Sequence, residues 1–230
     1  MKSLMLGLVA TAAMIGPAAP TFAQSATPPK GCEAFLTVQF KGCLMSIYWR
    51  CPSAPEGTTW EASYDEDGPL SVSTFNKEFQ WLDTYFFFDR SRERMQDTGP
   101  KPALLSELLK TGRNEYEFTT FVSSEDGNQS ITYAGVDTLS GETTMVDGET
   151  LLITEFASIA VDADTGEQLH STFGSQYVLE DENLFMLGTD TWTEDGVTEQ
   201  SDYSPLDILR PGDKGFGRTK PLYGCGAVTL

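Results

Sequence analysis

The sequence has little of what catalysis needs: it contains one histidine, His170, and neither a Gly-x-Ser-x-Gly nor a Cys-x-x-Cys motif. A Ser/His/Asp or Cys/His apparatus must therefore use His170 or do without histidine. His170 lies inside a predicted strand, and nothing around the neighbouring Ser171 resembles the sharp turn that exposes a catalytic serine. These absences count against the hydrolase and thiol-redox classes, so we expect a protein without catalytic activity.

Lysine and arginine are absent from residues 114–209, which contain 21 aspartates and glutamates. A surface this acidic repels the phosphates of nucleic acids and of anionic lipids, so nucleic acid is excluded as a partner. The acidic region is interpreted either as a solvated surface or as a face that docks a cationic partner or divalent ions. The basic runs at residues 90–94 and 210–220 are expected to fold back against it within the same molecule.

Long apolar runs are also missing. Ser3–Gly16 is apolar or small over about 14 residues, too few to span a bilayer as a helix, and no later segment is longer. It follows a short basic start and precedes Pro17–Ala23, the order of a secretory signal peptide cleaved after Ala23. No cysteine lies at that site, which argues against a lipoprotein. We therefore expect residues 1–23 to be removed and residues 24–230 to be periplasmic or secreted, with no transmembrane segment.

The cysteines present are few, and each has a predicted partner. They are Cys32, Cys43, Cys51 and Cys225. An oxidising compartment favours two disulfides, which leaves no support for a zinc site. Cys43 and Cys51 flank the predicted strand Leu44–Arg50, which would place them about 26 Å apart, far beyond the ~7 Å that a disulfide spans. A two-residue turn at Lys41-Gly42 would place Cys32 opposite Cys51. This favours Cys32–Cys51 with Cys43–Cys225, whereas a loop one residue different would favour another pairing.

Most of the remaining chain alternates between short strands and turns rich in glycine, aspartate and asparagine. Further strands are predicted at Trp60–Asp65, Pro69–Phe75, Phe79–Phe88, Glu115–Ser123, Gln129–Leu139, Thr143–Val146, Thr150–Val161, Gln168–Leu179, Leu184–Thr193 and Val197–Tyr203. Short strands at this even spacing are typical of antiparallel sheets. The sequence thus predicts a mainly β fold, an antiparallel up-and-down meander that forms a curved sheet or open barrel.

One short helix is predicted at Pro102–Lys110, where leucines form an apolar stripe and Gly112 is placed to end the helix. A helix of this length is marginal alone and must pack on the sheet. Residues 205–230, which contain several prolines and glycines, are interpreted as an extended C-terminal arm. Residues 24–230 then form a single β-rich domain.

In strand count the pattern is similar to envelope β carriers of the lipocalin or lipoprotein-carrier type. It departs from lipocalins in lacking their Gly-x-Trp signature, because Ile47 and Tyr48 precede Trp49. The resemblance implies a curved sheet around an apolar ligand. Phe79–Phe88 carries the candidate lining, and we select Trp81, Tyr85 and Phe87, with core packing as the alternative. Neighbouring residues of a strand point to opposite faces, so at most half of this aromatic segment can face one cavity.

Asp162–Glu167 resembles the first half of a calcium loop, with oxygen ligands at alternate positions before Gly166. The loop would need a bidentate glutamate at position 173, which is Phe173, so we expect a hairpin turn and no metal or cofactor. Together the patterns predict a non-enzymatic binding or carrier module for an apolar or small molecule. The alternative is a structural or interaction protein that docks another envelope protein through its acidic face.

Overall fold

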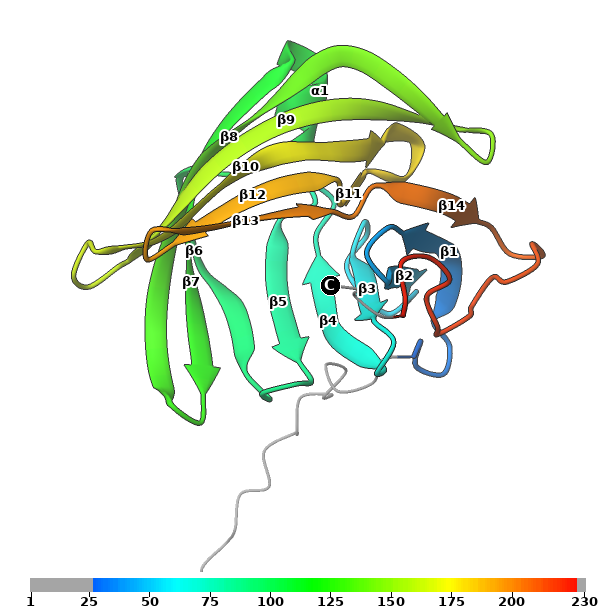
Figure 1. The fold of residues 1–230 in the computed structure, drawn as a ribbon, viewed down its shortest axis with the longest axis horizontal. Coiled ribbons are helices and arrows are strands. Elements are labelled where there is room, and N and C mark those ends of the chain that lie inside the picture. Colours follow the sequence, from blue (N-terminus) through cyan, green and yellow to red (C-terminus); the bar gives the residue numbers. More distant parts are fainter. Residues whose placement is uncertain (1–26, 227–230) are drawn as a thin grey trace, which may run out of the picture.

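The computed structural model describes residues 27–226, so the predicted signal peptide lies outside the described residues. Within them, 14 strands form one antiparallel sheet in the order β13-β12-β10-β9-β8-β7-β6-β5-β4-β3-β2-β1-β14, with β11 paired to β10. The meander confirms the predicted fold class: the sheet is curved but not closed, and one short helix packs on it (Figure 1). No helix among the described residues is long and apolar enough to cross a membrane.

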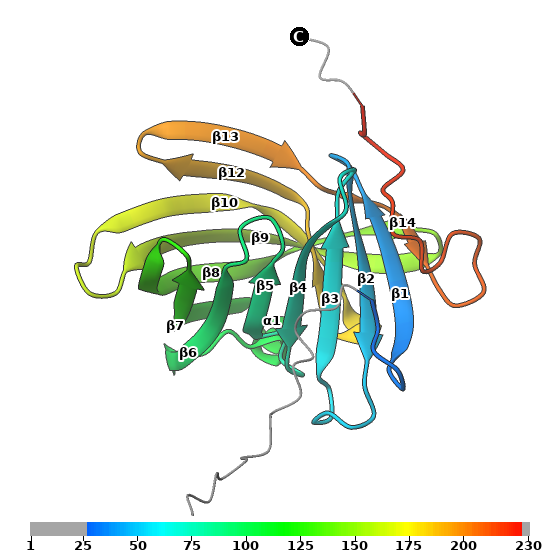
Figure 2. The same cartoon turned by 90° about the horizontal axis from the view of Figure 1, so that it is seen from below.

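The strands are β1 (Glu33–Phe40), β2 (Leu44–Arg50), β3 (Thr59–Tyr64), β4 (Pro69–Phe75), β5 (Trp81–Phe86), β6 (Arg92–Lys101), β7 (Arg113–Ser124), β8 (Gly127–Val146), β9 (Glu149–Asp162), β10 (Gln168–Leu179), β11 (Leu184–Met186), β12 (Thr189–Glu194), β13 (Val197–Asp202) and β14 (Pro205–Leu209). The helix α1 spans Leu105–Thr111, and a 3-10 turn, η2, spans Glu180–Glu182. In Figure 1 the long strands β8, β9 and β10 arch over β3, β4 and β5, and Figure 2 shows the same curvature from below.

The main core joins the start of the sheet to its far part. Leu36 and Phe40 of β1 pack with Leu151 of β9, Leu179 of β10 and Ile208 of β14, and all five side chains are at most 2% exposed. Burying a side chain of this size stabilises a fold by about 1.5–3 kcal/mol. The contacts between β1 and strands far from it in the sheet hold the sheet in its curved form.

The turn of the first hairpin differs from the prediction, whereas the disulfide beside it agrees with the prediction. Phe40 pairs with Leu44, so the turn has three residues rather than the predicted two, and Cys43 lies inside it with a φ of 58°. A β-bulge between Ala34 and Leu36 adds one residue to β1 and cancels this shift. The predicted disulfide between Cys32 and Cys51 is therefore formed despite the different turn.

The C-terminal segment, which the sequence predicts to be an extended arm, begins with β14. This strand pairs with β1 and so occupies one edge of the sheet, while β13 occupies the other. Beyond it the chain crosses the outer face of β1, where Gly217 N donates to Thr37 Oγ1 (3.0 Å) and Leu222 N donates to Gln39 Oε1 (2.9 Å). The predicted Cys43–Cys225 disulfide then joins this segment to the first hairpin.

The helix α1 closes one end of the curved sheet. It ends as predicted at Gly112, whose φ of 82° is the left-handed conformation that favours glycine and whose N–H donates to Leu108 O. It begins at Leu105 rather than Pro102, since Leu104 is extended. Leu105 and Leu108 are buried against Val178 of β10, which supplies the packing that so short a helix requires.

Candidate functional site

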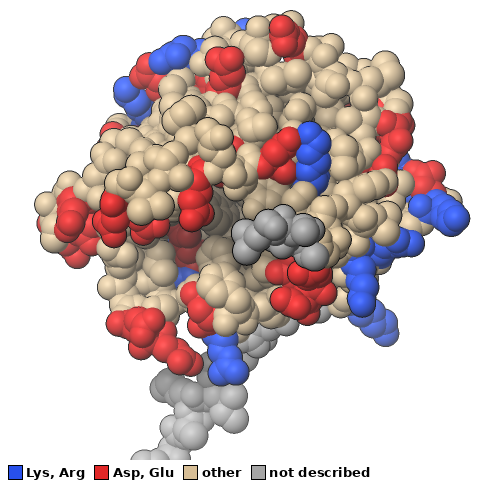
Figure 3. Space-filling model, viewed as in Figure 1, with Lys and Arg blue, Asp and Glu red and all other residues tan. Residues whose placement is uncertain are grey.

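The concave side of the sheet encloses a cavity of about 860 Å³. Strands β3–β5 line one side, β7–β10 and β12 line the other, and the residues before α1 close one end. Figure 3 shows the surface hollowed near the centre of the view, with Asp and Glu more frequent around the hollow than Lys and Arg. A cavity of this size is typical of a site for a small organic ligand.

Aromatic rings form one wall of the cavity. Phe118 of β7 lies opposite Tyr133 of β8, and their ring centroids are 5.3 Å apart. Tyr133 is followed by His170 of β10 at 6.2 Å, and His170 stacks on Trp192 of β12 at 3.7 Å. We call these four residues the aromatic wall. The strand register explains the arrangement, because each ring occupies an inward position of its strand.

Tyr116 of β7 lies beside the aromatic wall, and a glycine makes room for it. A side chain on Gly135 of β8 would place its Cβ 2.6 Å from the Tyr116 hydroxyl, which no real contact allows. The Tyr116 hydroxyl also forms a hydrogen bond with Ser158 of β9. The Tyr116 ring therefore lies against the sheet over Gly135, and Tyr116 lines the cavity.

Two carboxylates of the cavity are held by hydroxyl groups on one oxygen only. Glu61 Oε1 accepts hydrogen bonds from Ser46 and Tyr48, and Glu93 Oε1 accepts from Thr120 (2.6 Å) and Tyr133 (3.0 Å). In the part of the chain that the structure describes, no donor reaches Oε2 of either residue. Burial raises the pKa of both carboxyl groups, and the hydroxyl donors only partly oppose it.

Asp137 of β8 has even fewer partners. It lies opposite Phe156 of β9 on the cavity side, and none of the hydrogen bonds among residues 27–226 reaches its carboxylate. Burial raises the pKa of Asp137 to about 7. Asp190 of β12, three strands away in the same inward row, also has its pKa raised by burial. Both carboxylates are therefore costly to ionise and face the cavity with unused acceptor atoms.

No lysine or arginine lies among the residues that line the cavity within the described chain. Arg92 of the neighbouring strand β6 is engaged elsewhere, in a bidentate pair with Asp83 on the outer face of β5. The expected fold-back of the C-terminal basic run is seen at Arg210, which pairs with Glu149 and Glu182 outside the cavity. The cavity therefore contains carboxyl groups without a lysine or arginine beside them in its described lining.

Of the three aromatic residues selected from the sequence, the structure places only Trp81 in the cavity. Tyr85 and Phe87 lie on the opposite face of the sheet with their rings 5.2 Å apart, and Phe87 packs against a separate core cluster there. The cause is a β-bulge at Leu82, which changes the face to which the preceding residue points. Phe86, of the other parity, lines the cavity instead.

His170 has the environment of a wall residue. Its ring stacks on Trp192 with an interplanar angle of 23°, and no serine hydroxyl among the described residues forms a hydrogen bond with it. Burial lowers the pKa of the imidazole, opposed in part by the charge of Glu194, its cross-strand neighbour. The ring is therefore neutral at pH 7, and its chemistry in the cavity is that of an aromatic surface.

The predicted hairpin at Asp162–Glu167 uses its acidic oxygens internally. Asp162 Oδ1 accepts from the backbone of Asp164 (3.0 Å) and Thr165 (2.7 Å), and Oδ2 accepts from Gln129 (2.8 Å). These donors lower the pKa of Asp162 to about 2. The carboxylate thus shapes the turn between β9 and β10.

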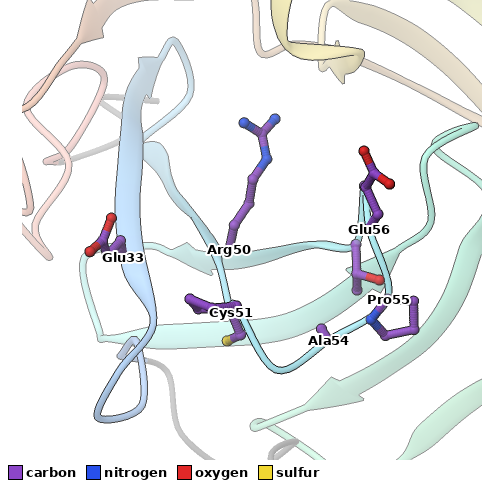
Figure 4. A pocket seen from close by; sticks show the side chains of 9 residues that line it. Glu33, Arg50, Cys51, Ala54, Pro55 and Glu56 are labelled. Carbon is purple, nitrogen blue, oxygen red and sulfur yellow. The ribbon is translucent and has the colours of Figure 1, made fainter.

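A second, smaller hollow of about 390 Å³ lies where β2 leaves the sheet, around Arg50, Cys51 and Glu56 (Figure 4). The Arg50 guanidinium already pairs with Glu182 (3.0 Å) and lies 4.0 Å from the Phe35 ring centroid. Because its one cation is engaged and its lining comes mainly from a surface loop, we take the larger cavity as the candidate site.

Comparisons with known proteins do not identify a functional site in this chain. No family model matches the chain, and no curated protein matches it. Among solved structures, the chain is similar to the hypothetical lipoprotein YmcC from Escherichia coli (K12), at 12% identity over 77% of this chain and 88% of that chain, with a TM-score of 0.43. A likeness of this size says nothing about ligand or activity.

The two disulfides indicate the compartment. All four cysteines are paired, with no free thiol among them. Disulfides persist in oxidising surroundings and are rare in the cytosol. The chain is therefore that of an extracytoplasmic protein.

Proposed function

We propose that this chain is an exported, non-enzymatic binding or carrier module whose concave cavity holds a small organic ligand. The observation that carries the proposal is the cavity of about 860 Å³, lined by the aromatic wall and left open by a sheet that does not close. The volume lies within the range of about 300–1,000 Å³ that holds a drug-sized molecule. The inward hydroxyls and carboxylates then supply the polar contacts that orient such a ligand.

The test uses a neutral apolar fluorescent probe, N-phenyl-1-naphthylamine, with two matched variants. Ser158→Phe adds a ring inside the cavity, whereas Ala157→Phe adds the same ring to the exposed outer face of β9. We expect saturable probe binding to the wild type and to A157F, and at least a tenfold weaker affinity for S158F.

Equal affinity for the two variants would place the probe elsewhere and refute the proposal. Absence of binding, together with a native mass equal to a whole multiple of the chain, would favour the second candidate. In that case the protein docks another envelope protein, and the acidic surface is the contact.

A further inference from the structure

We propose that the ligand of this cavity carries a positive charge: it is an organic cation, an ammonium or guanidinium group attached to an apolar body. The inference rests on the proposed binding function and adds the chemical class of the ligand. Three independent features of the cavity carry it, namely the sign of its charges, the unused oxygen atoms of its carboxylates and the position of its aromatic rings.

The sign of the charges comes first. The lining contains five carboxylates, and no lysine or arginine stands among the described residues that form it. They are Glu61, Glu78, Glu93, Asp137 and Asp190. When these groups are ionised, an anionic ligand would face uncompensated repulsion, and a cation would gain attraction that no lysine or arginine of the lining already satisfies. Charge alone therefore discriminates among ligands of similar shape.

Two of these carboxylates, Glu93 and Asp137, also have oxygen atoms that accept no hydrogen bond from the described residues. Glu93, a lining residue, uses Oε1 for the hydroxyls of Thr120 and Tyr133, and Oε2 accepts no hydrogen bond from the described residues. Asp137 has no hydrogen-bond donor within the described part of the chain. A buried carboxylate normally finds a partner, so an oxygen without one at a cavity wall is where a donor of the ligand would bind.

The aromatic rings stand beside these oxygens. Tyr133 connects the two features directly, since its ring belongs to the aromatic wall while its hydroxyl binds Glu93 (3.0 Å). Phe156 lies opposite Asp137 on the neighbouring strand, and the Cβ atoms of two residues paired in this way are about 5 Å apart. Aromatic faces attract cations, most strongly when both are removed from water. A ring and a carboxylate side by side form a surface that suits an ammonium group.

The body of the ligand is expected to be apolar. Trp81, Phe86 and Met95 line the cavity with the aromatic wall, so that a hydrocarbon or aromatic moiety would replace water along these side chains. A bare metal ion fits less well, because no group of three or more metal-ligating side chains is found within residues 27–226. The geometry thus favours a cation with an apolar body over an inorganic one.

The experiment is isothermal titration of the folded protein at pH 8 with octylamine, 1-octanol and octanoate, which share a chain and differ in head-group charge. We expect octylamine to bind at least tenfold more tightly than octanol, and octanoate to bind most weakly. Asp137→Asn removes one carboxylate at constant shape and should reduce the preference for octylamine over octanol about tenfold, leaving the affinity for octanol unchanged. Glu155→Gln, on the exposed outer face of β9, is the matched control and should change neither affinity.

The outcomes separate the two proposals. If octanol binds as tightly as octylamine, or if D137N leaves the preference intact, the cation inference is overturned while the cavity keeps its binding role. If none of the three compounds and no neutral probe binds, both proposals fail. Lowering the pH from 8 to 5 adds a check, because protonation of the cavity carboxylates should weaken the binding of octylamine and leave that of octanol unchanged.

Discussion

The Asp137 carboxylate makes the stability of this protein depend on pH in a way that one substitution should remove. In the folded protein burial raises its pKa to about 7, whereas the ordinary value is 3.8. The folded state therefore holds its proton to higher pH than the unfolded state does. Above pH 4 the free energy of unfolding consequently falls as the pH rises, and the fall ends near pH 7 to 8.

The magnitude follows from the two pKa values. A difference of about three units corresponds to about 4 kcal/mol when both states are fully ionised, since each unit is worth about 1.4 kcal/mol. Between pH 5 and pH 8 the expected part of this penalty is about 2–3 kcal/mol. The substitution Asp137→Asn leaves a neutral amide with no charge to bury, so D137N should gain on the wild type by that amount over this interval.

Urea unfolding of the wild type and D137N at pH 5 and pH 8, followed by circular dichroism, measures the gain. The variant should be more stable than the wild type at pH 8, with the difference shrinking at pH 5. E155Q, which removes a carboxylate from the outer face of the neighbouring strand, serves as the control and should show no such change. A difference between D137N and the wild type that is the same at both pH values would show that the folded protein does not raise this pKa, and the reasoning on its burial would be wrong.

Three further predictions concern other parts of the fold. Replacing Cys43 and Cys225 by serine should cost up to about 5 kcal/mol, more than loss of the shorter disulfide, because their separation of 182 residues closes the larger loop in the unfolded chain; urea unfolding measures both. Arg210→Gln breaks both ion pairs made after β14 and should lower stability by about 1 kcal/mol, and the loss should shrink in 0.5 M salt. Protonation of His170 should quench the fluorescence of Trp192 with a midpoint below pH 6.5, and H170Q should abolish that step of the titration.

The parts of the fold that can be predicted from sequence are those that local chemistry decides. The hairpin turns at Gly68, Gly148, Gly166 and Gly196 are predicted because aspartate or glutamate with glycine provides the backbone conformations that tight turns need. The helix end at Gly112 follows from the same property of glycine. Turn chemistry acts over two to four residues, so no tertiary information is required to recognise it.

Three features could not be predicted, and each depends on residues far away in the sequence. Strand β6 is missed because its residues 92–101 are mostly charged or polar, and it becomes a strand through pairing with β7. Predicted strand 184–193 is divided into β11 and β12. The bulges at Phe35 and Leu82 add one residue each to β1 and β5, and the side chains of Phe35 and Leu82 do not distinguish a bulge from a regular strand position. Since a bulge changes the face of the residues beyond it, the prediction for Tyr85 and Phe87 depended on information that the sequence does not display.

The candidate site illustrates the same limit. One of its walls comes from β7–β12, where inward positions mix aromatic residues with serine and threonine. Taken strand by strand, Phe118, Tyr133, His170 and Trp192 are isolated aromatic residues. Only the register between strands brings their rings into one wall, and register depends on turn lengths and bulges along the entire meander.

The absence of lysine and arginine from residues 114–209 acquires a physical meaning once the cavity is known. This segment forms most of β7 and all of β8–β14, and its inward positions include Asp137 and Asp190. A long basic side chain at an inward position of these strands could reach one of the two carboxylates and satisfy it within the protein, as Arg92 does for Asp83 on the outer face. Without any such residue in the described lining these carboxylates stay unpaired, and under the proposal a cation from outside supplies the missing positive charge. Lysine and arginine are also absent from the outer face of these strands, but a basic residue there could not reach the cavity. A lysine at an inward position, by contrast, could pair with Asp137 or Asp190 and would then oppose the proposed binding of a cation.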